Sequence, residues 1–153
     1  MSKRFWLATL AGVGLFILDR VTRTLAFGHG DTVLIPKILK SLPIKNFGVA
    51  LGLNFTNGQI SAVVISSLLL VVVIVLATQG LKRKNFYTWL STNLIFLGAF
   101  SNLLDRVIYG SVRDFLKFSF WPTTNNIGDL MVTVGAIILI ITYKPNPKKL
   151  LKH

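Results

Sequence analysis

The most informative stretch of the chain lies between residues 98 and 129. It reads Gly-Ala-Phe-Ser-Asn-Leu-Leu-Asp-Arg at 98–106, Val-Arg-Asp-Phe at 112–115 and Asn-Ile-Gly-Asp at 126–129. Three of the chain's five acidic residues lie here, on or between two strongly apolar segments. A carboxylate at the end of an apolar helix is costly to bury, so it indicates a function or a fixed partner. We expect Asp114 and Asp129 to form a pair at a membrane surface, held in place by the rest of the chain.

Composition points to a single membrane domain. The 153 residues are 52% hydrophobic and only 14% charged, whereas a soluble domain carries about 25% charged residues. The length suits one domain spanning 1–153. There is no cysteine, which excludes a disulfide framework and a thiolate metal site. His29 and His153 do not combine with the acids into a metal site, so no metal is expected.

The net charge of +12 does not indicate a nucleic-acid partner, because the basic residues flank apolar runs and do not form one patch. Lys and Arg beside long apolar runs are typical of membrane orientation signals. Their positions can therefore be used to orient the chain.

Four segments approach the roughly 20 residues that a membrane-spanning helix needs. They run from about Phe5 to Phe27, Ile60 to Thr78, Phe86 to Ile108 and Ile127 to Tyr143. The first resembles a secretory signal, but no small-residue cleavage site follows it, so we interpret it as an uncleaved helix. The expected fold class is an all-α integral membrane protein with four transmembrane helices and a small extracytoplasmic β segment.

Basic clusters follow alternate crossings and fit one side of the membrane, which should be the cytoplasm. They are Lys3-Arg4, the run at 82–84, and the lysines from Lys144 onward. Both termini are then inside, and all five Asp lie toward the other side. The lysines at 37, 40 and 45 lie outside and weaken this bias without reversing it.

Sequence distances predict the depth of the acids. Asp19 lies 15 residues after Arg4, and Asp129 lies 15 residues before Lys144. At 1.5 Å per residue both lie roughly 22 Å from the inner surface, so two helices bring an Asp to the same level. Asp105, near the end of the third segment, is expected close to the outer rim.

The region 28–59 is the sizeable outside segment, inserted between the first and second helices. Glycines and prolines punctuate it, and the runs Thr32–Ile35 and Ile44–Leu53 are interpreted as strands. It is too apolar for a plain solvated loop, so a small sheet lying on the membrane surface is expected.

Asp114 and Asp129 each have an ordinary explanation when taken alone. Asp129 opens a helix, where the dipole and the free N–H groups favour a carboxylate. Asp114 could pair with Arg113 or Lys117. Together at a membrane rim they offer catalysis, because two carboxylates that share a site do not both ionise easily. One can act as a base toward water while the other donates to a carbonyl oxygen, which is peptide hydrolysis.

Further polar residues are expected to support this pair. Asn102, Asp105 and Arg106 lie at i, i+3 and i+4 on one helix face, and Asn126 lies three residues before Asp129. Alternatively, Arg106 pairs with an Asp and the amides satisfy buried backbone groups.

Three other positions each have two possible interpretations. Asp19, with Arg20 and Arg23, is either an interfacial anchor or part of the site. Asn46-Phe47-Gly48 is either a turn or a backbone segment that an extended substrate approaches. Gly98 is either a site residue or a close helix contact.

These motifs, in this order, resemble those of lipoprotein signal peptidase, the signal peptidase II of bacteria. The resemblance covers the whole chain, from Leu18-Asp19 and the run Asn-Phe-Gly-Val-Ala at 46–50 to the motifs at 102–106, 112–115 and 126–129. It implies a membrane aspartic endopeptidase that cleaves prolipoproteins just before their diacylglyceryl-modified cysteine.

The resemblance also implies roles for residues. Asp114 and Asp129 would be the catalytic dyad, surrounded by Asp19, Asn46, Gly48, Gly98, Asn102, Asp105, Arg106 and Asn126. The outside segment would be a β cradle that grips the substrate. We also expect a monomer that needs no cofactor, contacts membrane lipid and is sensitive to the cyclic peptide globomycin. Its site is expected on the outer face of the bacterial cytoplasmic membrane. Some positions depart from the family pattern, among them Arg23 for a usual Lys and Ser101 for a usual Gly.

A small proton- or ion-coupled transporter is the alternative, since intramembrane Asp residues often mark ion pathways. The acids cluster at one rim with none deep on the inner side, which disfavours a path across the membrane. A non-catalytic membrane scaffold is a third reading, and it predicts that Asp114→Asn leaves function intact.

Overall fold

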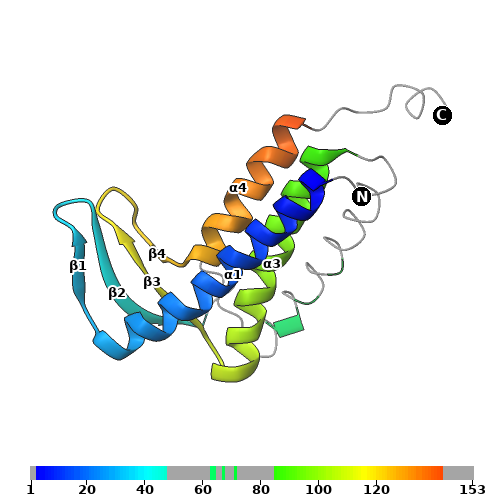
Figure 1. The fold of residues 1–153 in the computed structure, drawn as a ribbon. Coiled ribbons are helices and arrows are strands. Elements are labelled where there is room, and N and C mark those ends of the chain that lie inside the picture. Colours follow the sequence, from blue (N-terminus) through cyan, green and yellow to red (C-terminus); the bar gives the residue numbers. More distant parts are fainter. Residues whose placement is uncertain (1–2, 48–62, 65–66, 68–70, 72–84, 143–153) are drawn as a thin grey trace, which may run out of the picture.

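The computed structural model describes residues 3–47, 63, 64, 67, 71 and 85–142. Three long helices and a four-stranded sheet make up these residues (Figure 1). The helices are α1 (Lys3–His29), α3 (Phe86–Tyr109) and α4 (Ile127–Thr142). The strands are β1 (Thr32–Ile35), β2 (Leu39–Asn46), β3 (Val112–Phe118) and β4 (Thr124–Asn125).

Local sequence explains where α3 begins and ends. The side chain of Asn85 accepts hydrogen bonds from the backbone N–H groups of Tyr87 and Thr88, at 3.0 and 3.2 Å, which satisfies donors that a helix start leaves free. Gly110 ends the helix with φ 71°, a left-handed conformation that glycine adopts without strain. The chain then turns directly into β3.

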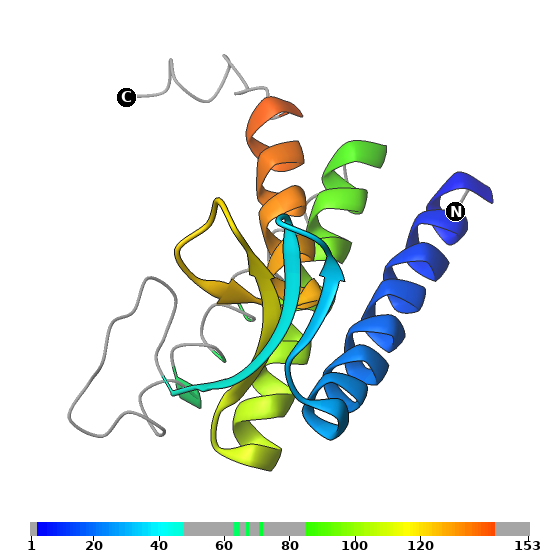
Figure 2. The same ribbon diagram turned by 90° about the vertical axis from the view of Figure 1, so that its left-hand side faces the viewer.

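The helices α1 and α3 run in the same direction, and α4 runs the opposite way (Figures 1 and 2). Aromatic contacts hold α1 against α3: the ring centroids of Phe5 and Phe86 are 5.7 Å apart, and those of Phe16 and Phe100 are 6.0 Å apart. A glycine allows α3 and α4 to lie close together, because a Cβ atom at Gly98 would collide with a backbone oxygen of α4. Close backbone approach through small residues is how helices associate in lipid.

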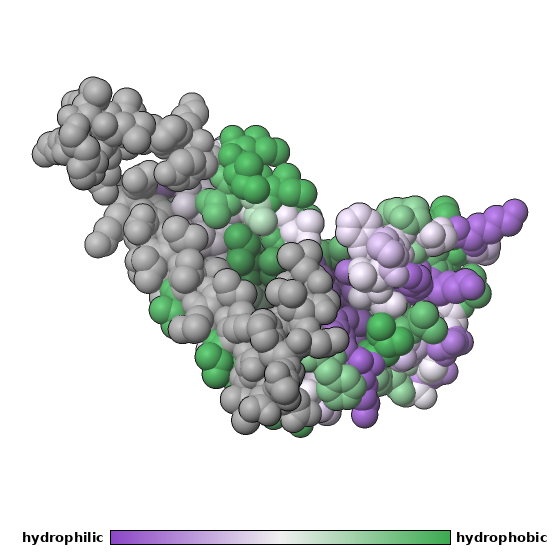
Figure 3. All heavy atoms as spheres, turned by 180° about the vertical axis from the view of Figure 1, so that it is seen from behind, coloured by the Kyte–Doolittle hydropathy of each residue, from purple (hydrophilic) through white to green (hydrophobic). Residues whose placement is uncertain are grey.

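The distribution of polarity is the reverse of that in a soluble protein. Within the described residues, the largest fully buried side chains are all polar: Arg23, Asn126, Thr92, Asp19, Asp105, Asp114, Ser91, Ser101 and Ser111. Large apolar side chains on the helices are exposed, including Trp6, Leu10, Ile137, Ile140 and Ile141. Figure 3 shows hydrophobic surface where α4 ends and hydrophilic side chains toward the sheet. This is the distribution expected of helices surrounded by lipid.

By length and composition, α1 is the one helix among the described residues that is long and apolar enough to cross a membrane. Helix α4 is apolar but shorter. The helix bounds predicted for the first, third and fourth segments are confirmed to within two residues at each end, while four membrane crossings stay a prediction. The predicted second segment, Ile60 to Thr78, lies almost entirely outside the described residues.

The sheet is antiparallel throughout, in the order β1-β2-β3-β4. Its apolar contacts reach the ends of α1 and α4, where Ala26, Phe115 and Leu116 form a small buried cluster against Leu39, Phe118 and Ile127. The sheet is thereby fixed to the end of the bundle that carries the acids.

The predicted sheet needs two corrections. The strand Thr32–Ile35 is confirmed, but the next strand covers Leu39–Asn46 and does not begin at Ile44; residues 48–53 lie outside the described residues. The sheet is also not confined to 28–59, because β3 and β4 come from residues 112–125. The charges of Arg113 and Asp114 made β3 resemble a loop, whereas both side chains are buried against partners.

Candidate active site

Asp114 lies in the middle of the site, on β3, with 1% of its surface exposed. Two side-chain amides hold its two oxygens. Asn46 Nδ2 donates to Oδ2 at 2.9 Å, and Asn126 Nδ2 donates to Oδ1 at 2.6 Å. Asn46 is the last residue of β2, which pairs with β3, and Asn126 directly precedes α4. Three elements therefore converge on one carboxylate.

Asp129 lies in the first turn of α4. Its Oδ1 accepts from Asn102 Nδ2 at 2.7 Å, and its Oδ2 accepts from the backbone N–H of Asn126 at 3.2 Å. In return, the backbone N–H of Asp129 donates to Asn126 Oδ1 at 2.8 Å. This reciprocal pattern is a capping box with Asp in the position usually held by Glu. The helix start thus explains Asp129 locally, and Asn126 connects it to Asp114.

Burial and, second to it, the negative charge of Asp129 together raise the pKa of Asp114 to about 6, against the lowering effect of the amides of Asn46 and Asn126. A carboxyl group with this pKa exchanges its proton near neutral pH. Carboxyl groups perturbed by burial and by a second carboxylate are typical of acid–base catalysis.

A buried arginine, Arg23, organises the residues behind the pair. Its Nε donates to Asp19 Oδ2 at 2.8 Å, Nη1 to Asp105 Oδ2 at 2.8 Å, and Nη2 to Asn102 Oδ1 at 2.7 Å. Since Arg23 has only donors, it must face the oxygen of the Asn102 amide. The nitrogen of that amide then faces Asp129, so one guanidinium sets the orientation of a group that contacts the site.

Asp105 is fully buried and forms ion pairs with three arginines. Arg20 Nη1 lies 2.6 Å from its Oδ1, Arg23 Nη1 lies 2.8 Å from its Oδ2, and Arg113 Nη2 lies 3.1 Å from its Oδ1. The backbone N–H of Arg113 also donates to it, at 2.9 Å. Asp105 thereby ties α1 and α3 to the start of β3, one residue before Asp114.

Asp19 confirms the predicted match in depth between α1 and α4. Its Oδ1 accepts from the backbone N–H of Gly128 at 3.0 Å, and its Oδ2 accepts from Ser101 Oγ at 2.5 Å. Gly128 is tightly enclosed: a Cβ atom there would lie 3.0 Å from Asn126 Oδ1 and 3.1 Å from Arg23 Nη2. Asp19 therefore positions the first turn of α4.

The structure brings most of the predicted site residues into one network. It contains Asp19, Asn46, Asn102, Asp105, Asp114, Asn126 and Asp129. Arg106 donates from Nη1 to the carbonyl oxygen of Asn102 at 3.4 Å, and Gly98 packs against α4. Gly48 lies outside the described residues. Among those described, no three His, Asp or Glu side chains lie close enough together to hold a metal ion.

Two of the purely structural interpretations offered for these residues are wrong. Asp114 does not pair with Arg113, which binds Asp105, or with Lys117, which donates to the carbonyl oxygens of Trp121 and Pro122. Arg23 is no interfacial anchor, because it is fully buried.

Sequence reasoning did not assign Arg113 or Ser101 to the network, and it left open whether Arg23 is an anchor or part of the site. A usable signal existed for Arg23. It lies one helical turn after Asp19, on the same face of the first helix.

The comparisons with known proteins agree with this geometry. A family profile described as signal peptidase (SPase) II matches residues 11–144. A lipoprotein signal peptidase of Pelagibacter ubique is 30% identical over 147 residues, covering 91% of this chain and 88% of that protein. One of Staphylococcus aureus is 29% identical over 151 residues, covering 92% and 91%.

A solved structure also matches across nearly the whole chain. It is described as a bacterial membrane enzyme determined by the in meso method at 1.9 Å resolution. The TM-score is 0.75 at 25% identity, covering 95% of this chain and 93% of that one. With a family match over most of its length and relatives aligned end to end, the chain belongs to the signal peptidase II family.

Proposed function

We propose that this protein is a membrane aspartic endopeptidase that removes the signal peptide from diacylglyceryl-modified prolipoproteins, cutting just before the lipidated cysteine. Membership in the signal peptidase II family supports a peptidase acting on prolipoproteins. The observation that carries the aspartic mechanism is Asn126, which contacts Asp114 through its side-chain amide and Asp129 through its backbone N–H.

In the proposed reaction, Asp114 and Asp129 bind one water between them. One carboxylate takes a proton from this water as it attacks the scissile carbonyl. The protonated partner donates to the developing oxyanion and then passes a proton to the leaving amine. The raised pKa of Asp114 supports a proton shared by the pair near neutral pH.

The proposed topology has four transmembrane helices with both termini in the cytoplasm, in the bacterial inner membrane. The dyad then lies near the outer surface, where the diacylglyceryl group stays in the bilayer while the peptide crosses the site. The apolar exterior of α1 and α4 supports this placement. The enzyme is proposed to act as a monomer, without metal or cofactor, and to bind globomycin.

The proposal is tested with purified protein and two prolipoprotein substrates that differ only in the diacylglyceryl group on the cysteine. Mass spectrometry of the products locates the cut. We expect cleavage one residue before the cysteine in the lipidated substrate and little in the other. Equal cleavage of both, or a cut elsewhere, would contradict the proposed specificity.

A further inference from the structure

The far end of the sheet carries a cluster of lysines that the reaction does not use. We call the sheet tip the β1–β2 turn together with residues 119–121. We propose that the sheet tip binds the phosphate of an anionic phospholipid. A hollow of about 270 Å³ lies there, lined by Lys37, Ile38, Leu39, Lys40, Lys117 and Ser119. Three lysines, with no acid, suit a phosphate diester.

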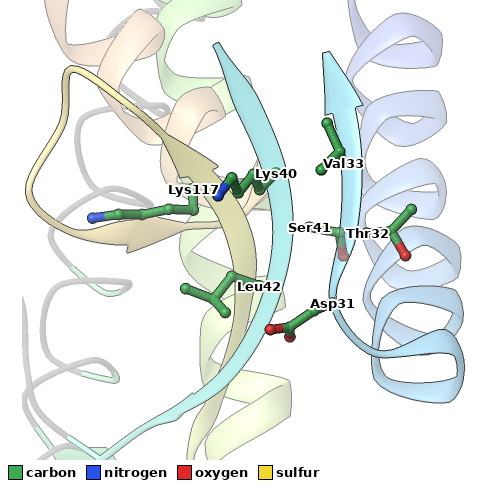
Figure 4. A pocket seen from close by; sticks show the side chains of 7 residues that line it. All are labelled: Asp31, Thr32, Val33, Lys40, Ser41, Leu42 and Lys117. Carbon is green, nitrogen blue, oxygen red and sulfur yellow. The ribbon is translucent and has the colours of Figure 1, made fainter. Parts of the chain in front are cut away.

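Two of these lysines are placed where their charges repel. Lys40 and Lys117 are directly opposite each other on β2 and β3, and like charges at such positions destabilise a sheet. Their side chains extend in the same direction from neighbouring strands (Figure 4). An anion bound beside them relieves the repulsion.

The backbone conformation at the third lysine, Lys37, does not favour a lysine. Lys37 has φ 62°, a left-handed conformation that glycine or asparagine adopts more easily. Folding alone would favour one of those residues in the turn. A lysine at this position instead adds a charge to the hollow.

The sheet tip is held in a fixed shape. The backbone N–H of Ser119 donates to the carbonyl oxygen of Ile38 at 3.0 Å, and its hydroxyl donates to that of Lys37 at 2.7 Å. The Lys117 ammonium donates to the carbonyl oxygens of Trp121 and Pro122, at 3.0 and 2.6 Å. These bonds join the β1–β2 turn to the loop after β3, so the backbone that carries the lysines is in place before binding.

Exposed apolar side chains of the sheet tip favour a lipid over free phosphate. Ile38, Phe120 and Trp121 are 50, 74 and 52% exposed. Strand β1 leaves the end of α1 and turns back toward the level of the helices while diverging from them (Figures 1 and 2), so the sheet tip lies beside the layer that the helices occupy. Aromatic rings and lysines together are typical of the lipid headgroup region. This step rests on the membrane location proposed above.

A neighbouring hollow of about 370 Å³ shares Lys40 and Lys117 but also contains Asp31 (Figure 4). A carboxylate there repels phosphate. The three-lysine hollow is therefore the proposed site, and the neighbouring one is not.

The test measures binding of a soluble short-chain phosphatidylglycerol to the full-length protein in a zwitterionic detergent. The key variant is Lys37→Asn with Lys40→Gln. It removes two charges, suits the backbone at position 37, and leaves the hydrogen bonds of Lys117 in place. Lys45→Gln is the matched control, because Lys45 is an exposed lysine nearer the other end of β2.

Each lysine near an anionic headgroup contributes on the order of a fivefold change in affinity. We expect the double variant to bind about 25-fold more weakly at low salt and Lys45→Gln to bind like wild type. Equal affinity of wild type and double variant would overturn the proposal. So would equal binding of phosphatidylcholine or of inorganic phosphate alone, which would indicate a purely apolar or a purely ionic contact. Because no cleavage is measured, failure here is distinct from failure of the proposed reaction.

Discussion

Asn126 donates its side-chain N–H to Asp114 Oδ1 at 2.6 Å while its own side-chain oxygen caps α4 at the N–H of Asp129, 2.8 Å away. One amide thus joins a carboxylate on a strand to the first turn of a helix. The distance between the two Asp is set by a capping interaction. Catalytic geometry and helix stability are therefore coupled at this residue, and substitutions can separate them.

Asn126→Ser should keep the cap and lose the donor to Asp114, because Ser caps helices about as well as Asn but has no amide. Asn126→Ala should lose both. We expect both variants to lose peptidase activity, and the Ala variant to be less stable than the Ser variant by about 1 kcal/mol. Thermal unfolding and cleavage rates measure the two effects. A Ser variant with wild-type activity would show that the amide is dispensable.

The unfolding free energy should depend on pH through Asp114. Its pKa is 3.8 when unperturbed and about 6 in the fold, so the folded protein holds the proton more tightly. The stabilisation is complete below pH 3.8 and is lost as the pH rises through about 6. Asp114→Asn does not titrate. Relative to wild type it should therefore gain roughly 2 kcal/mol between pH 4 and pH 7.

Chemical unfolding in detergent at these two pH values checks this expectation. Asp31→Asn serves as the control for the chemical change itself, because it is the same substitution at an exposed position. A parallel pH dependence of wild type and Asp114→Asn would contradict a raised pKa.

Arg23→Lys should weaken the network although it keeps the charge. A lysine cannot reach Asp19, Asp105 and Asn102 with the planar fork that the guanidinium provides. We expect a loss of about 1–3 kcal/mol in stability and a fall in activity, because Asn102 is no longer held with its N–H toward Asp129. In Arg20→Lys the loss should be smaller, since Arg20 is partly exposed. A double-mutant cycle of Arg23→Lys with Asn102→Ala measures the coupling. A coupling energy of zero would show that Arg23 does not orient Asn102.

Gly98→Ala should separate α3 from α4, because the added methyl group would collide with the carbonyl oxygen of Gly128. Overpacking of this kind costs about 1–3 kcal/mol. Gly14→Ala is the matched control: its Cβ would have no neighbour within 4 Å, and Ala is the better helix former. Relative to wild type, the melting temperature should fall in Gly98→Ala and rise in Gly14→Ala. Equal melting temperatures would contradict the close packing at Gly98.

The sequence predicted the helix bounds and the shared level of Asp19 and the start of α4 well, because these follow from apolar run length and a fixed rise per residue. The contact of Asp19 with the backbone of Gly128 is the clearest example. Strand β3 was missed, since Arg113 and Asp114 resemble solvent-facing residues until their partners are known.

The partners of Asp105 were beyond sequence reasoning for a different reason. Three arginines from two elements converge on it, and one-dimensional spacing relates none of them to Asp105. The pairing depends on how α1, α3 and β3 pack, which only the three-dimensional arrangement supplies.

The central claim is that Asp114 and Asp129 together activate a water, and the most direct measurement is the turnover of a lipidated prolipoprotein by three folded variants. Asp114→Asn and Asp129→Asn should each lower kcat by about 10²–10⁴-fold, while Asp31→Asn should cleave like wild type. Near-normal turnover in either dyad variant, with folding verified, would contradict the two-aspartate mechanism.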